Sequence, residues 1–235
     1  MIHLTIDNQK IEVQEGRTLL EACRENGFPI PTLCYHPALE PYGACRLCVV
    51  EITYPSGPSR LVASCTYPCE EGLQVSTEST QVRRSRRMTA ELLLASAWNS
   101  PEIKALADEF GVSEARCYME EADMCILCGL CVRACQEIVG ISAISFIQRG
   151  IQKQVSPPFR ISSVNCIGCG TCTLICPTHA IRLADITIKS SLQIVHQTGD
   201  GGMIENCQVC GLIDLSPHYY SHPESILGDI RARLS

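Results

Sequence analysis

Cysteine is the residue that most constrains this chain. There are 17 cysteines among 235 residues, and most stand in groups with two residues between neighbours. In a small secreted protein such a density would predict disulfides. Here the number is odd, and residues 1–10 alternate polar and apolar side chains instead of forming the charged and apolar parts of a secretion signal. We therefore expect a cytoplasmic protein whose cysteines bind metal.

The remaining composition limits the kind of protein. Apolar residues make up 46% of the chain, enough to build hydrophobic cores. The formal net charge of −6 argues against nucleic acid as the main partner. No apolar run reaches the roughly 18 residues of a membrane-spanning helix, and no glycine-rich phosphate-binding motif follows a strand. We expect neither a membrane span nor a nucleotide site in this chain.

The first 78 residues predict a mixed domain. Alternating residues on both sides of Asp7 and Asn8 predict a hairpin, and Thr18 is a suitable N-cap for a short helix that Gly27 ends. The expected elements are strands at 2–6 and 10–13, a helix at 19–26, and strands at 48–53, 60–64 and 73–77. Two strands, a helix and then more strands are typical of an α+β fold.

Four cysteines in and after the proline-rich loop form a C-x10-C-x2-C-x16-C set: Cys34, Cys45, Cys48 and Cys65. Four thiolates are what a [2Fe–2S] cluster requires, two for each iron. Gly43 and Ala44 permit a loop whose backbone N–H groups turn toward sulfur, which offsets the negative charge of a cluster. A structural zinc site is the main alternative, because four thiolates also suit zinc. Buried free cysteines are the other.

The second half of the chain contains an internal repeat. The run C-x2-C-x2-C-x3-C occurs twice, with an offset of 41 residues. In bacterial ferredoxins with this run, the fourth cysteine of one run binds the cluster of the other. We therefore expect two [4Fe–4S] clusters with crossed ligands, Cys125, Cys128, Cys131 and Cys176 for the first cube and Cys135, Cys166, Cys169 and Cys172 for the second. Two structural zinc sites are the alternative, although this spacing is not that of zinc ribbons.

Two segments carry a family resemblance. Residues 29–36, PIPTLCYH, and 44–51, ACRLCVVE, resemble the ferredoxin-type N-terminal domain of the large peripheral iron–sulfur subunit of complex I. They are also similar to the diaphorase iron–sulfur subunit of NAD-linked bidirectional [NiFe] hydrogenases and to the iron–sulfur part of some [FeFe] hydrogenases. The resemblance implies a β-grasp fold that holds a [2Fe–2S] cluster on the four matching cysteines. It extends into the helix at 87–94, RMTAELLL.

After that helix the sequence departs from these relatives. They usually have a site of one histidine and three cysteines there for a further [4Fe–4S] cluster, whereas residues 95–116 contain neither Cys nor His. We expect 79–112 to be helical and to lack that cluster, as in a shortened subfamily that accompanies flavin- and NAD(P)-binding subunits in anaerobes. The arginine-rich run 83–87 predicts a solvated face, with docking of an acidic partner or softening of the field of anionic clusters as alternatives.

Five cysteines lie outside these sets. Cys23, on the first helix, and Cys69, near the first cluster, are expected to be buried structural thiols. Cys207 and Cys210 form a further C-x2-C pair near the end of the sequence. This pair could anchor zinc or an additional cluster together with one or more of three other residues, His218, His222 or Cys117. Two free thiols or a redox pair are the alternatives, and spacing does not decide between them.

These features predict an α+β protein in four parts. The expected domains are a [2Fe–2S] β-grasp ferredoxin domain at 1–78, a helical connector at 79–118, a two-[4Fe–4S] domain resembling bacterial ferredoxins at 119–188, and a tail with the C-x2-C pair at 189–235.

The predicted role is that of a non-catalytic electron-transfer subunit in a multi-subunit, NAD(P)H-linked, flavin-dependent oxidoreductase. By resemblance, its partner is a flavin- and NAD(P)-binding subunit similar to the complex I flavoprotein subunit with its small [2Fe–2S] partner. Electrons would then pass to ferredoxin, a hydrogenase or a formate dehydrogenase, and flavin-based electron bifurcation is one such scheme. A stand-alone soluble polyferredoxin is the alternative, and a zinc-rich structural or regulatory protein is a third class.

Overall fold

The structure is a computed structural model that describes residues 1–54, 57–120, 123–157 and 166–181. These residues form two compact units. One comprises residues 1–130 together with 177–180, and the other is built on residues 131–176. No helix in the described part of the chain has the length and apolarity needed to cross a membrane. Cys207, Cys210, His218 and His222 lie outside the described residues.

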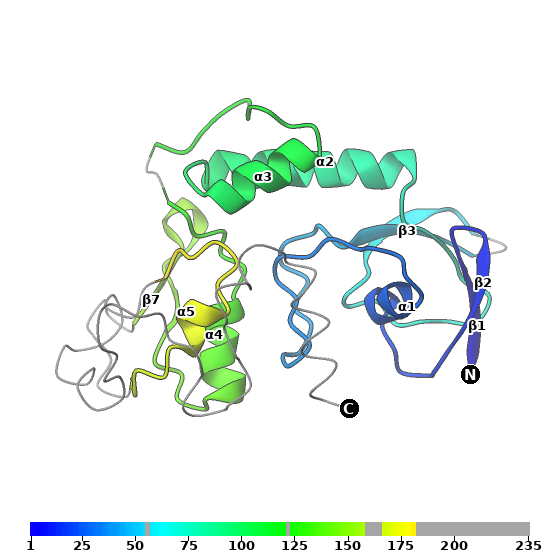
Figure 1. Cartoon of the computed structure of the whole chain (residues 1–235), viewed down its shortest axis with the longest axis horizontal. Coiled ribbons are helices and arrows are strands. Elements are labelled where there is room, and N and C mark those ends of the chain that lie inside the picture. Colours follow the sequence, from blue (N-terminus) through cyan, green and yellow to red (C-terminus); the bar gives the residue numbers. More distant parts are fainter. Residues whose placement is uncertain (55–56, 121–122, 158–165, 182–235) are drawn as a thin grey trace. The chain divides into compact units, whose positions relative to one another are not determined.

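The first unit contains a mixed five-stranded sheet with a short helix, as the sequence predicts. The strands lie in the order β2-β1-β5-β3-β4, and only the β1–β5 pair is parallel. Figure 1 shows the α1 helix beside this sheet. The elements are β1 (Ile2–Ile6), β2 (Gln9–Val13), α1 (Leu19–Glu25), β3 (Val49–Thr53), β4 (Arg60–Ala63) and β5 (Gln74–Ser76).

Local turn and cap chemistry explain why the chain folds this way at its start. Asp7 and Asn8 have φ angles of 45° and 69°, so they form the two-residue turn that suits the twist of a hairpin. The Asp7 carboxylate also accepts a hydrogen bond of 2.8 Å from the backbone N–H of Thr77, which fixes β5 beside the turn. Thr18 caps α1, and Glu21 completes a capping box. These signals confirm the predicted hairpin and helix.

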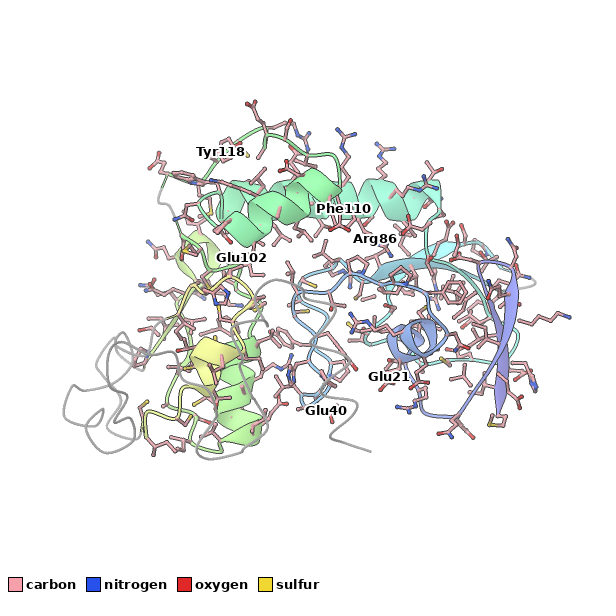
Figure 2. All side chains as sticks on the ribbon, in the orientation of Figure 1. Glu21, Glu40, Arg86, Glu102, Phe110 and Tyr118 are labelled. Atoms are coloured by element: carbon pink, nitrogen blue, oxygen red, sulfur yellow. The ribbon has the colours of Figure 1, made fainter. Side chains whose placement is uncertain are left out.

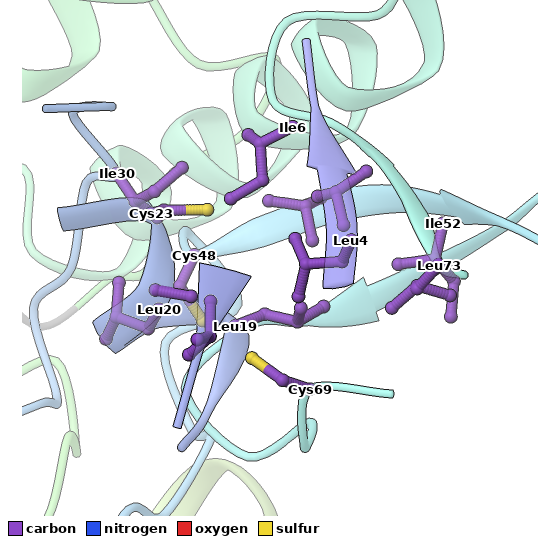
Figure 3. Packing of buried hydrophobic residues seen from close by; sticks show 14 of the residues in the cluster. Leu4, Ile6, Leu19, Leu20, Cys23, Ile30, Cys48, Ile52, Cys69 and Leu73 are labelled. Carbon is purple, nitrogen blue, oxygen red and sulfur yellow. The ribbon is translucent and has the colours of Figure 1, made fainter. Parts of the chain in front are cut away.

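The hydrophobic core of this unit lies between α1 and the sheet. Leu19, Leu20 and Ile52 are fully buried in it. Figure 3 shows the thiols of Cys23 and Cys69 within the same packing. Burial raises the pKa of Cys23 to about 12 and that of Cys69 to about 11, so both remain neutral thiols. The prediction that these two cysteines are buried structural residues is therefore confirmed.

Two helices continue the first unit. They are α2 (Thr80–Ser96) and α3 (Pro101–Glu109), and their N-caps are Ser79 and Ser100. The α3 helix folds back along α2 (Figure 1), and Ala97, Ile103 and Ala107 are buried where they pack. The predicted helical character of 79–112 is confirmed. Since α2 starts at Thr80, the arginine-rich run 83–87 lies inside this helix.

The second unit is small and irregular. A short helix, α4 (Leu130–Arg133), enters it and continues into a π-helical turn, η1 (Ala134–Ile138). The strands β6 (Ser145–Ile147) and β7 (Gln154–Ser156) form an antiparallel pair, with a 3-10 turn, η2 (Gly150–Gln152), between them. The last described helix is α5 (Thr171–Leu174). Short elements joined by tight turns suit a chain whose cysteines must converge on a small site.

Candidate iron–sulfur sites

The first cysteine set is arranged as two pairs. The thiols of Cys34 and Cys45 are hydrogen-bonded, and the backbone N–H of Cys45 donates to the sulfur of Cys34 at 3.2 Å. The Sγ atoms of Cys48 and Cys65 lie 3.4 Å apart. All four side chains are buried. Because each iron of a [2Fe–2S] cluster takes two thiolates, this division into pairs fits a two-iron cluster.

Within each pair of thiols, one pKa is lowered and the other is raised. The hydrogen bond from Cys34 lowers the pKa of Cys45 to about 6, and the bond from Cys65 lowers the pKa of Cys48 to about 7. Their partners, Cys34 and Cys65, have raised pKa values because each donates to the other sulfur of its pair and is buried. Within each pair one thiol thus donates to the sulfur of the other, which matches the two-by-two division of the set.

The loop before the second pair directs backbone N–H groups at sulfur. Leu33 donates to the sulfur of Cys45 at 3.5 Å, and Ala44 donates to Cys34. Gly43 and Arg46 have φ angles of 69° and 59°, which produce the reversals that aim these groups inward. The prediction that this loop turns its N–H groups toward sulfur is confirmed. Such bonds offset the charge of a cluster and raise its reduction potential.

A single zinc ion fits this arrangement less well. Tetrahedral zinc needs four ligands around one point. The pairwise division of the four cysteines favours the two-iron alternative.

The residues predicted for the second cube come together in the second unit. One cavity is lined by all four of them, Cys135, Cys166, Cys169 and Cys172. Its other lining residues include Val139, Ile141, Ala143 and Ile144, so its walls are largely apolar. The backbone N–H of Ala143 donates to the sulfur of Cys135 at 3.2 Å. Apolar walls, four thiols around one cavity and an N–H···S bond fit a [4Fe–4S] cluster.

The residues predicted for the first cube are divided between the two units. Cys125 and Cys128 belong to the first, and Cys131 and Cys176 belong to the second. Around Cys125 the local chemistry is that of a cluster loop, because the N–H of Leu127 donates to its sulfur at 3.4 Å. Leu127 reaches this position with a φ angle of 53°. The complete ligand set of the first cube remains a prediction.

A buried hydroxyl distinguishes the second cube from the first. Thr171 is 1% exposed, and its Oγ1 lies 3.4 Å from the sulfur of Cys169. A thiolate bound to iron has no proton to donate, so the hydroxyl must be the donor once the cube is present. At the 41-residue offset of the repeat, the equivalent residue is Leu130, which has no such group.

The first testable prediction concerns this hydroxyl. Thr171→Val is expected to lower the potential of one cube by about 30 to 60 mV, because a hydrogen bond to a charged sulfur contributes about 1 kcal/mol and 59 mV corresponds to tenfold in a one-electron equilibrium. Thr171→Ser keeps the hydroxyl and is expected to leave the potential unchanged. A redox titration followed by EPR measures both. Equal shifts in the two variants would attribute the effect to packing.

Arg86 is a residue near the first site whose position the sequence did not predict. The arginine-rich run 83–87 predicted a solvated face, and this is wrong for Arg86, which is 2% exposed. Its Nε donates to the carbonyl oxygen of Leu47 at 3.1 Å, and its Nη2 donates to that of Val49 at 2.9 Å. Figure 2 shows it on α2. Val82 and Ala90, four residues before and after Arg86, mark the inward face of α2 and are the sequence signal that could have placed it.

The leftover cysteines gain no metal partner from the described residues. Cys117 is exposed. The pair Cys207 and Cys210, with His218 and His222, falls outside the residues that the structure describes, so the suggestion of an additional zinc or iron–sulfur site stays a prediction.

Comparison with known proteins agrees with these sites. Residues 1–80 match the family described as a 2Fe-2S iron-sulfur cluster binding domain, and residues 124–180 match the 4Fe-4S dicluster domain. A chain in the crystal structure of NAD+-reducing [NiFe]-hydrogenase in the H2-reduced state has 34% sequence identity and a TM-score of 0.56. The match covers 67% of this chain and 75% of that one.

Curated relatives are longer proteins. An NADH-quinone oxidoreductase subunit of Rhizobium meliloti is 31% identical over 77% of this chain and 24% of its own length. The alpha subunit of NADPH-Fe(3+) oxidoreductase of Geobacter sulfurreducens is 33% identical over 76% and 24%. The HndD subunit of the NADP-reducing hydrogenase of Solidesulfovibrio fructosivorans is 31% identical over 77% and 36%. The chain thus spans about a quarter to a third of these relatives.

The fold and the sites define an iron–sulfur protein, with one [2Fe–2S] domain followed by a two-[4Fe–4S] domain. More narrowly, the chain belongs to the same family as the matched chain of the NAD+-reducing [NiFe]-hydrogenase. Its sequence is also similar to parts of subunits of NADH-quinone oxidoreductase, NADPH-Fe(3+) oxidoreductase and NADP-reducing hydrogenase. The predicted resemblance, the α+β fold class and the three clusters are confirmed.

Proposed function

We propose that this chain is a non-catalytic electron-transfer subunit of a multi-subunit, NAD(P)H-linked, flavin-dependent oxidoreductase. The supporting observation is the pair of cysteine sites, Cys34 to Cys65 in one unit and Cys135 to Cys172 in the other. Iron–sulfur clusters supply one-electron transfer when bound. The described residues around these sites bring thiols together, direct N–H groups at sulfur and provide apolar surroundings, which are the tasks of an electron carrier.

The ligand sets belong to this proposal. Cys34 and Cys45 would hold one iron of the [2Fe–2S] cluster, and Cys48 and Cys65 would hold the other. The four cavity cysteines would hold the second cube. Cys125, Cys128, Cys131 and Cys176 would hold the first cube.

The proposed partners follow from the relatives, whose names are those of subunits in larger complexes. A flavin- and NAD(P)-binding subunit, similar to the complex I flavoprotein subunit with its small [2Fe–2S] partner, would exchange electrons with the clusters. A ferredoxin, a hydrogenase or a formate dehydrogenase would complete the path, with electron bifurcation as one form of it. The domain boundaries predicted at residues 78, 118 and 188 belong to the same proposal.

Iron analysis provides the second testable prediction. One [2Fe–2S] and two [4Fe–4S] clusters require about 10 iron atoms per chain, whereas about 14 would mean a third cube, either the further family cluster or one on Cys207 and Cys210. In this chain the corresponding stretch, 95–116, buries Ala97, Ile103 and Ala107 in a small apolar core. Anaerobic purification followed by iron and zinc determination measures the number. Zinc in place of iron would refute the proposed function.

Co-purification tests the partner. The native complex is expected to contain a flavoprotein, and NAD(P)H is expected to bleach the clusters only when that subunit is present. If the chain purifies alone and exchanges electrons with diverse carriers, the stand-alone polyferredoxin becomes the better description.

A further inference from the structure

Helix geometry explains why Arg86, on α2, is buried beside the first cysteine set. Val82, Arg86 and Ala90 stand at intervals of four residues, and all three are buried. Residues at this spacing share one face of a helix, and this face packs against β3. Arg84, in the same run, is exposed. Arginine is normally solvent-exposed. Among these three buried residues, Arg86 is the one that carries a charge into the protein.

Arg86 hydrogen-bonds the two residues that flank Cys48. Its Nε donates to Leu47 and its Nη2 donates to Val49, both at backbone carbonyl oxygens. The guanidinium is planar and its donors have a fixed geometry, so two simultaneous bonds hold the segment in one conformation. Cys48 lies between the two bonded carbonyls and is therefore held at a fixed position relative to Cys65.

The charge of Arg86 is only partly balanced. Its Nη1 is 2.7 Å from a carboxylate oxygen of Glu78, whose side chain is 58% exposed. Water screens an exposed carboxylate, so it compensates less for a buried charge than a buried partner would. A positive charge that is only partly compensated consequently remains on the guanidinium group that bonds the Cys48 segment. A cluster gains one negative charge when it is reduced, and a positive field favours that form.

We propose that Arg86 is a positioning residue for the [2Fe–2S] cluster, which fixes the Cys48 segment and raises the reduction potential of the cluster. The inference rests on the proposed function in one respect, that Cys48 is a ligand. Arg86 would thus act on the cluster without binding it, through its hydrogen bonds to the backbone and through its positive charge.

The experiment is a redox titration of the purified, cluster-loaded full chain, followed by EPR. Arg86→Met keeps most of the side-chain volume and removes the charge and both hydrogen bonds. We expect the reduction equilibrium of the [2Fe–2S] cluster to fall about tenfold, which is 59 mV for one electron. The two cubes serve as internal references and should keep their potentials. Arg84→Met, from the exposed part of the same run, is the matched control and should shift nothing.

Two further variants separate charge from packing. Arg86→Lys keeps the charge, so it should restore most of the potential while the [2Fe–2S] EPR line shape stays altered, since an ammonium group cannot bridge both carbonyls in the same way. Glu78→Gln removes the compensating carboxylate at the surface and should raise the potential. If Arg86→Met fails to fold, Arg86→Lys still tests the proposal, because an unchanged [2Fe–2S] line shape in that variant would refute the positioning role.

The failures are distinguishable. If wild-type protein shows no [2Fe–2S] signal, the proposed function fails. If the signal is present and neither Arg86→Met nor Glu78→Gln changes its potential relative to the cubes, only the role of Arg86 is refuted. Equal shifts in Arg84→Met and Arg86→Met would also refute it, because they would reflect overall charge.

Discussion

Replacing Cys48 by alanine is expected to lower the iron content from about 10 to about 8 atoms per chain and to abolish the [2Fe–2S] EPR signal. The reason is the pairing of the four thiols. Cys48 and Cys65 lie together, so the substitution leaves one iron with a single protein sulfur. The cubes belong to a different part of the chain and should remain. Alanine is preferred to serine because it offers no oxygen ligand.

The matched control for this variant is Cys23→Ala. Cys23 is buried in the same core as Cys48, but its thiol has a pKa of about 12 and it belongs to neither pair. The control should keep about 10 iron atoms and its EPR spectrum, at a small cost in stability from the lost sulfur. Retention of the [2Fe–2S] signal in Cys48→Ala, or its loss in Cys23→Ala, would contradict the ligand assignment.

The sequence was sufficient where structure depends on neighbouring residues. Asp7 and Asn8 specify a two-residue turn through their tolerance of positive φ, and Thr18 with Glu21 specifies the start of α1. The cysteine sets were also recognisable, because ligand spacing is a local property. Observed strand ends differ from predicted ones by at most one residue, as is usual where pairing fades.

What the sequence could not supply depends on residues far apart in the chain. Spacing identified Cys34, Cys45, Cys48 and Cys65 as one set, but their division into pairs appears only when Cys65 is placed beside Cys48 by the β3–β4 pairing. The same holds for Arg86, whose partners Leu47 and Val49 are nearly forty residues away. The arginine-rich run alone gives no helical phase, and only Val82 and Ala90, at four-residue spacing on either side, indicate which arginine faces inward.

Replacing Cys135 by alanine is expected to damage the second cube, although Cys135 belongs to the first cysteine run. The structural reason is that Cys135 lines the same cavity as Cys166, Cys169 and Cys172. The cube that loses its fourth thiolate loses at least the iron at that corner, so iron should fall from about 10 to between about 9 and about 6 atoms per chain. Cys176→Ala should damage the first cube to a similar extent.

Iron content alone does not show which cube was damaged, but Thr171 provides a label. Its hydroxyl acts only on the cube that Cys169 binds. In Cys135→Ala the surviving intact cube should therefore be insensitive to Thr171→Val, whereas in Cys176→Ala it should remain sensitive. If each run instead bound its own cube, the two outcomes would be exchanged. EPR redox titration of the four single and double variants therefore decides between crossed and uncrossed ligation, because the two arrangements predict opposite results from the same proteins.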